Sequence, residues 1–172
     1  MRVYEAVIAL MVTSFFLGGL VPAPLNIASS LFFSASALHL LLNLVILGFY
    51  GKILEDGMGA RWFATIYLCG AVWGILFSGV SVGGFQASMA PGASAGLMAL
   101  LGTIVALRPL AWVVADFFPV PAFVAAGFFI IVRLILEQNL DIMPLLLGIA
   151  FGYPINESKQ QPAPAGRGPP RA

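Results

Sequence analysis

Long apolar stretches, separated by short polar or proline-containing segments, dominate the chain from residue 3 to residue 155. A helix that crosses a bilayer needs roughly 20 mainly apolar residues, because ~30 Å of hydrocarbon offers its backbone no water. The pattern predicts an all-α bundle of six transmembrane helices, and it predicts no strands, because the apolar runs are long and do not alternate with polar residues. The expected spans are residues 3–21, 34–54, 61–80, 92–107, 120–136 and 140–155.

Two segments differ from these spans. Residues 108–121 contain prolines that break a helix, and their Trp112 and Asp116 are typical of a segment at the membrane interface. Residues 156–172 are polar and rich in Pro, Gly and Gln, so we expect a disordered tail. The sequence therefore predicts one membrane domain, residues 1–155, followed by a disordered cytoplasmic tail, residues 156–172.

Basic residues predict the orientation of these spans. Seven of them flank the N-terminus, the loops after the second and fourth spans, and the tail, whereas only Arg133 lies close to the opposite side. Loops rich in Lys and Arg stay in the cytoplasm. Both termini are therefore expected there, which requires an even number of spans. The seven residues are Arg2, Lys52, Arg61, Arg108, Lys159, Arg167 and Arg171.

Composition narrows the function classes. Hydrophobic residues make up 60% and charged residues 9%, whereas soluble domains carry about 25% charged residues. This argues against a soluble enzyme, a disordered protein and a nucleic-acid binder. The net charge of +1 gives no reason to expect a polyanionic partner. The single cysteine excludes an internal disulfide and a cysteine-cluster metal site, and we expect no metal and no cofactor.

Polar side chains inside the apolar spans are costly and call for an explanation. His39 and Asn43 share one face of the second span, Ser94 lies near the start of the fourth, and Asp141 near the start of the sixth. Each also has a purely structural interpretation. His39 and Asn43 could be a helix-packing pair, Ser94 a packing serine, and Asp141 a carboxylate at a helix N-terminus. All three spans run from outside to inside, so these groups lie at one depth and could form a single hydrated site.

Several motifs, in this order, resemble those of the rhomboid family of intramembrane serine proteases, over nearly all of the first 155 residues. His39 to Asn43 resembles the H-x-x-x-N motif of the second span, and residues 92–94 resemble the start of G-x-S-G. Smaller matches accompany these two motifs. They are Gly51, Glu55, Gly59 and Arg61, the run Leu100-Leu101-Gly102, Pro121-Ala122, and Gly148 with Gly152.

The resemblance implies a six-helix bundle with a wet cavity that opens to the outer face. It implies Ser94 as the nucleophile, and His39 and Asn43 as parts of an oxyanion hole together with the backbone N–H of Ser94. Such chemistry needs a hydroxyl to attack a peptide carbonyl and fixed donors to stabilise the developing charge. The implied substrate is the membrane helix of another protein. We interpret Glu55 and Arg61 as anchors rather than catalytic groups.

The sequence departs from the family pattern at two places. Ala95 follows Ser94 where the family usually has glycine. More seriously, the family's dyad histidine on the last span is missing, because His39 is the only histidine of the chain. Aligning Gly148 with the family's later glycine puts Asp141 at the histidine position and Pro144 at the earlier glycine. A serine without a base is a poor nucleophile at neutral pH.

Three functions therefore stay open. The first is a catalytically impaired rhomboid that binds the transmembrane segments of other proteins without cutting them. The second is an active intramembrane serine endopeptidase in which Asp141 serves as substitute base, if desolvation raises its pKa toward neutrality. The third is a small transporter or a membrane-assembly subunit on the same bundle. The sequence does not fix the oligomeric state.

Overall fold

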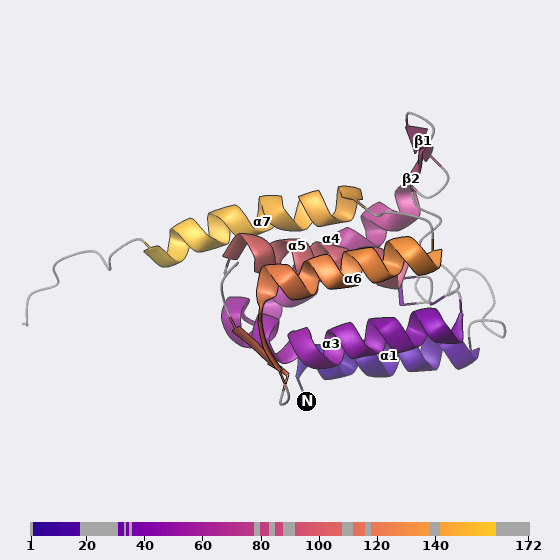
Figure 1. The fold of residues 1–172 in the computed structure, drawn as a ribbon, viewed down its shortest axis with the longest axis horizontal. Helices are drawn as coiled ribbons and strands as arrows, with labels where there is room; N and C mark the ends of the chain where they lie inside the picture. Colours follow the sequence, from indigo (N-terminus) through magenta and orange to yellow (C-terminus); the bar gives the residue numbers. More distant parts are fainter. Residues whose placement is uncertain are drawn as a thin grey trace, which may run out of the picture.

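The fold is a bundle of helices, seen in a computed structural model that describes residues 2–17, 31–32, 34, 36–77, 80–82, 85–87, 92–107, 112–115, 118–137 and 142–160. Each helix of this part of the chain overlaps one of the six apolar segments, which confirms the helical class (Figure 1). The helices are α1 (Val3–Leu17), α3 (Ala37–Met58), α4 (Ala60–Leu76), α5 (Gly92–Leu107), α6 (Ala122–Glu137) and α7 (Ile142–Gln160).

Two short hairpins join helices, so the expectation that strands would be absent is wrong at these places. β1 (Val80–Val82) pairs with β2 (Phe85–Ala87), and β3 (Trp112–Ala115) pairs with β4 (Phe118–Pro121), both antiparallel. A hairpin pairs backbone groups within one short segment, and so it needs no long alternating pattern. The second hairpin follows the prediction that residues 108–121 would not be helical.

Successive helices alternate in direction. In Figure 1, α3, α5 and α7 all begin at the right-hand end of the bundle, whereas α1, α4 and α6 begin at the left-hand end. The described chain therefore starts at the left-hand end, and α7 also finishes there. This arrangement brings residues in the first turns of α3 and α5, which are far apart in the sequence, to the same end of the molecule.

Helix α5 lies between α4 and α7 and is almost completely enclosed, since every residue from Gly92 to Ile104 is buried. Glycines of the two neighbours make this close packing possible, because small residues let helix backbones approach one another. A Cβ added at Gly148 of α7 would collide with the backbone carbonyl of Ala99. The Thr103 hydroxyl lies 2.9 Å from the carbonyl oxygens of both Ala99 and Gly148, and so it links α5 to α7.

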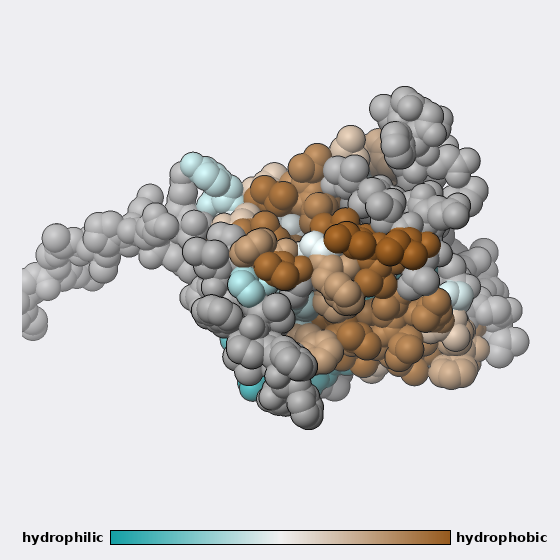
Figure 2. All heavy atoms as spheres, in the orientation of Figure 1, coloured by the Kyte–Doolittle hydropathy of each residue, from teal (hydrophilic) through white to brown (hydrophobic). Residues whose placement is uncertain are grey.

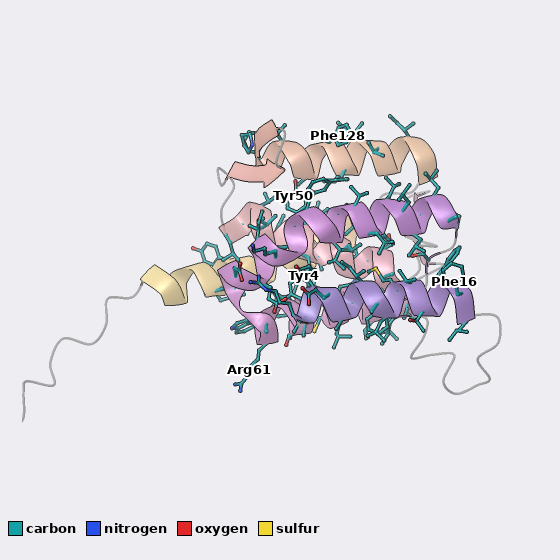
Figure 3. All side chains as sticks on the ribbon, turned by 90° about the horizontal axis from the view of Figure 1, so that it is seen from below. Tyr4, Phe16, Tyr50, Arg61 and Phe128 are labelled. Carbon is teal, nitrogen blue, oxygen red and sulfur yellow. The ribbon has the colours of Figure 1, made fainter. Side chains whose placement is uncertain are left out.

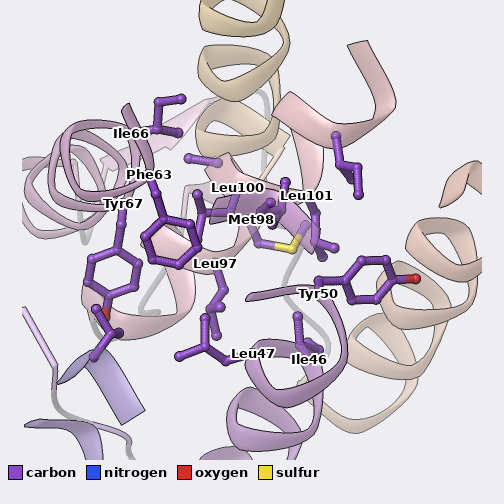
Figure 4. Packing of buried hydrophobic residues seen from close by; sticks show 14 of the residues in the cluster. Ile46, Leu47, Tyr50, Phe63, Ile66, Tyr67, Leu97, Met98, Leu100 and Leu101 are labelled. Carbon is purple, nitrogen blue, oxygen red and sulfur yellow. The ribbon is translucent and has the colours of Figure 1, made fainter. Parts of the chain in front are cut away.

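The hydrophobic core connects α5 to α3, α4 and α6. Figure 4 shows Ile46 and Leu47 of α3 and Leu97 of α5 within one cluster of buried residues. On the other side of that cluster, Tyr50 reaches toward α6, where its ring lies edge-to-face 6.0 Å from the ring of Phe129. The side chains that contact α5 thus come from helices on several of its sides.

A polar cluster joins α1 to α3 at the end where α1 begins. The Glu55 carboxylate accepts hydrogen bonds from the backbone N–H groups of Val3, at 3.2 Å, and Tyr4, at 3.0 Å. These two donors lie in the first turn of α1, where backbone N–H groups have no partner within the helix. Asp56 forms an exposed ion pair with Arg2 at 2.9 Å. Glu55 therefore anchors α1, as interpreted from the sequence.

Arg61, the second expected anchor, is exposed and extends away from the helices at this same end (Figure 3). Phe16 lies at the opposite end of α1 in the same view. Hydrophobic atoms cover the middle and right of the face drawn in Figure 2, whereas hydrophilic atoms gather mainly toward its left. Phe128, on the outer side of α6, is 61% exposed. Apolar side chains thus face outward over most of this surface.

Among the described residues, α3 alone is both long and apolar enough to meet a standard criterion for a membrane-crossing helix. Helices α1, α4 and α5, together with Met143–Ile155 of α7, are shorter apolar helices. Helix α7 continues to Gln160, so residues 156–160 are helical although we expected the disordered tail to begin there. Residues 161–172, the rest of that tail, lie outside the described residues.

Candidate functional site

His39 and Asn43 lie on one face of α3, at its third and seventh residues. Ser36 caps the helix, because its side chain accepts a hydrogen bond of 3.2 Å from the His39 backbone N–H. This is the usual role of serine before a first helical turn. Both side chains are turned into the protein, His39 being 7% exposed and Asn43 0% exposed.

Asn43 is held by a residue that precedes its own helix. Its Nδ2 donates a hydrogen bond of 3.2 Å to Oγ of Ser34, which is also 0% exposed. Its Oδ1 is buried and has no hydrogen-bond partner within the part of the chain that the structure describes. A buried amide oxygen without a partner is costly and calls for an explanation.

Ser94 is the third residue of α5 and is completely buried. Its place in the first turn puts it at the positive end of the helix dipole, where negative charge is stabilised. The structure thus gives Ser94 an electrostatic environment that suits a developing oxyanion, although a packing serine would be equally buried.

Ala95 follows Ser94 at the position where the motif compared in the sequence analysis has glycine, and glycines of α4 lie opposite its methyl group. A Cβ added at Gly74 of α4 would collide with the Ala95 Cβ, and a Cβ at Gly70 would lie 2.9 Å from the Ala95 carbonyl oxygen. The two helices are therefore in direct contact at this point, with the glycine on α4 rather than on α5. The start of α5 is accommodated without displacing Ser94 from the interior.

The structure brings His39, Asn43 and Ser94 to the same end of the bundle interior. Helices α3 and α5 run in the same direction, and both contribute buried side chains, Leu47 and Leu97 among them, to one hydrophobic cluster (Figures 1 and 4). Asn43 lies four residues before Leu47, and Ser94 lies three residues before Leu97. Asn43 and Ser94 are therefore each about one helical turn nearer the start of their helix than that leucine, at the end where both helices begin.

Asp141, which the alignment proposed from the sequence places at the family's histidine position, lies outside the described residues. Helix α7 begins directly after it, at Ile142, at the same end of the bundle as the starts of α3 and α5. Pro144 is buried in the first turn of α7, where a missing N–H removes no intrahelical bond. The proposed alignment thus leaves the helix intact.

Two further residues, Ser34 and Tyr67, belong to this end of the bundle and were not singled out from the sequence. The Tyr67 hydroxyl of α4 donates a hydrogen bond of 3.2 Å to the Leu31 carbonyl, and its ring stacks on Phe32 at 5.7 Å. The ring also packs on Gly96, since a Cβ added there would lie 2.8 Å from it. From the sequence, Tyr67 could have been recognised only as a tyrosine in the middle of an apolar span, because its hydroxyl needs a hydrogen-bond partner when buried.

No group of three or more His, Cys, Asp or Glu side chains that could bind a metal occurs among the described residues. Cys69 of α4 is exposed.

Comparison with known families agrees with the motifs. The family model described as Rhomboid domain matches residues 23–156, which are 134 of the 172 residues. The match includes the whole of α3 to α6 and the residues His39, Asn43 and Ser94. No curated protein and no solved structure matches the chain. The chain belongs to the rhomboid family and is therefore an integral membrane protein.

Proposed function

We propose that this protein binds the transmembrane helices of other membrane proteins at the His39, Asn43 and Ser94 end of the bundle, and that it does not cut them efficiently. The single observation that carries this proposal is that His39, the chain's only histidine, lies on α3. No second histidine exists to activate Ser94, and a serine hydroxyl without a base is a weak nucleophile. The fold and the polar groups that would receive an unwound helix are nevertheless retained.

The proposed topology has six crossings with both termini in the cytoplasm. The alternating helix directions of Figure 1 and the basic residues that flank alternate spans support it. The described basic side chains Arg2, Lys52 and Arg61 belong to the end where α1 and α4 begin. The proposed binding site is then at the outer end. Among the proposed crossings, α5 is short: its 16 residues give a helix about 24 Å long, whereas the hydrocarbon layer is ~30 Å thick.

The cost of polar groups in hydrocarbon supports a binding role for this end of the bundle. The amide of Asn43 and the hydroxyls of Ser34 and Ser94 are fully buried between apolar helices. A membrane helix that unwinds near its outer end exposes backbone N–H and C=O groups that need partners. The Oδ1 of Asn43, which has no hydrogen-bond partner among the described residues, could accept from such an N–H group, and amide or hydroxyl donors could satisfy a carbonyl.

Binding can be tested with a synthetic single-span peptide that carries a Gly-Ser pair in its outer quarter, in bilayer nanodiscs, by fluorescence energy transfer. Asn43→Leu keeps a similar side-chain volume but removes the amide, and we expect it to weaken binding at least fivefold. Thr65→Leu makes the same kind of change at an exposed site of α4 and serves as the matched control. Equal binding by wild type, Asn43→Leu and Thr65→Leu would contradict the proposal.

An active protease with Asp141 as base is the second candidate, because α7 begins directly after Asp141 at the end of the bundle where Ser94 lies. Mass spectrometry of the same peptide after incubation separates the two functions. Cleavage that disappears in Ser94→Ala, together with fluorophosphonate labelling that also disappears, would replace the binding proposal with a proteolytic one. If wild type leaves the peptide intact, Asp141→His is expected to gain cleavage, provided that only the base is missing.

A further inference from the structure

Four described residues just before α3 are attached to the bundle at several points. We call these residues the strap; they are Leu31, Phe32, Ser34 and Ser36. The Tyr67 hydroxyl donates to the carbonyl of Leu31, and the ring of Phe32 stacks on the Tyr67 ring with 21° between the ring planes. Ser34 accepts a hydrogen bond from Asn43 Nδ2, and Ser36 caps α3. The strap is therefore held from both α3 and α4.

The contact between Ser34 and Asn43 engages the same amide that the proposed function needs for a client. Ser34 Oγ is an uncharged oxygen that accepts from Asn43 Nδ2 at 3.2 Å, as a peptide carbonyl oxygen would. Both side chains are 0% exposed, so water does not compete for this bond. A client carbonyl that approached this N–H would meet the serine oxygen already there.

Tyr67 extends the effect of the strap to α5. One edge of its ring packs on Gly96, two residues after Ser94, while its hydroxyl holds Leu31. The ring of Phe32 covers Tyr67 on a further side. The strap, Tyr67 and Gly96 of α5 thus form one packed unit, two residues along α5 from the buried Ser94.

We propose that the strap is an autoinhibitory contact, in which Ser34 occupies an N–H of the Asn43 amide in place of a client's backbone carbonyl and must leave before a client carbonyl can bind there. This inference rests on the proposed helix-binding function. A client would bind only the open state, so its apparent affinity falls in proportion to the fraction of molecules that are open. Changes that loosen the strap should therefore increase access to Ser94 and tighten client binding.

Thiol labelling measures this opening without any client. The reporter is Ser94→Cys in a Cys69→Ser background, and the probe is a water-soluble maleimide applied to the full-length protein in mild detergent. Tyr67→Phe removes the hydrogen bond to Leu31 but keeps both ring contacts, and Ser34→Ala removes the bond to Asn43. Each should raise the labelling rate about fivefold, as expected for the loss of one neutral hydrogen bond.

Tyr153→Phe is the matched control, because Tyr153 is 67% exposed on α7, and it should leave the rate unchanged. Unchanged or slower labelling in both Tyr67→Phe and Ser34→Ala would overturn the proposal, as would a parent thiol at position 94 that reacts as fast as native Cys69. Slower labelling in Ser34→Ala alone would also overturn it, because Ser34 would then support the site instead of blocking it. These outcomes are independent of peptide binding, so failure of the strap is distinguishable from failure of the proposed function.

Discussion

Gly148→Ala should destabilise the bundle, because the new methyl group would enter the backbone of α5. Its Cβ would overlap the Ala99 carbonyl oxygen and lie 2.6 Å from the carbonyl carbon and 2.9 Å from Cα. Unbonded carbon atoms normally lie about 3.5–4.0 Å apart, so α7 would have to retreat by about 1 Å. The obstacle is backbone, which cannot rotate away as a flexible side chain could.

The expected size of this effect follows from three contributions. Inserting a methyl group into a tightly packed core costs about 1–3 kcal/mol. Withdrawal of α7 also weakens the link from Thr103 to the Gly148 carbonyl, which is worth about 0.6 kcal/mol for an average bond inside a membrane protein. Alanine restores up to about 1 kcal/mol, because it is a better helix former than glycine. The net loss in free energy of unfolding is about 2 kcal/mol.

Gly127→Ala on α6 is the matched control, because an added Cβ there meets nothing within 4 Å. It should be neutral or stabilising by up to about 1 kcal/mol. The measurement is reversible unfolding by SDS in mixed micelles, followed by circular dichroism at helical wavelengths. If Gly148→Ala proves as stable as Gly127→Ala, the close approach of α5 and α7 described here is incorrect.

Substitutions at three other positions test separate contacts by the same assay. Thr103→Val keeps the side-chain shape but removes the hydroxyl, and it should lower the free energy of unfolding by about 0.6–1.7 kcal/mol. Thr103→Ser keeps the hydroxyl and should retain most of the stability. Equal losses in the two variants would indicate that the hydroxyl link to Gly148 is absent. Glu55→Ala should cost about 1 kcal/mol, the usual value of a helix cap, and wild-type stability would exclude its anchoring role. Arg2→Ala should cost at most about 1 kcal/mol and less at high salt, because its ion pair with Asp56 is exposed; a large, salt-independent loss would contradict this.

Hydrophobic patterning predicts the helices well, because each has to satisfy its own backbone groups whatever lies beside it. The bounds of α5 agree with the expected residues 92–107. The hairpins and the extension of α7 were missed for a different reason. Hydropathy detects only apolar segments, so it assigned to the tail the polar residues into which α7 continues past the exposed Pro154.

Site prediction from the sequence succeeds where residues are close together in a motif and fails where contacts are long-range. The spacing of His39 and Asn43 predicts a shared helix face, and both side chains are buried there. The bond from Tyr67 to Leu31 joins residues 36 positions apart, and no local pattern encodes it. The roles of Ser94 and Asp141 remain predictions that labelling and cleavage experiments can decide.

The enclosure of α5 by α4 and α7 also constrains the order of assembly during synthesis. Residues 92–107 leave the ribosome before residues 142–160 exist, so one small-residue side of α5 has no protein neighbour at that stage. Docking of α7 against Ala99 and Thr103 must therefore come after α7 itself has been inserted. A chain truncated after α6 should consequently be a target of membrane quality control, even though it contains His39, Asn43 and Ser94.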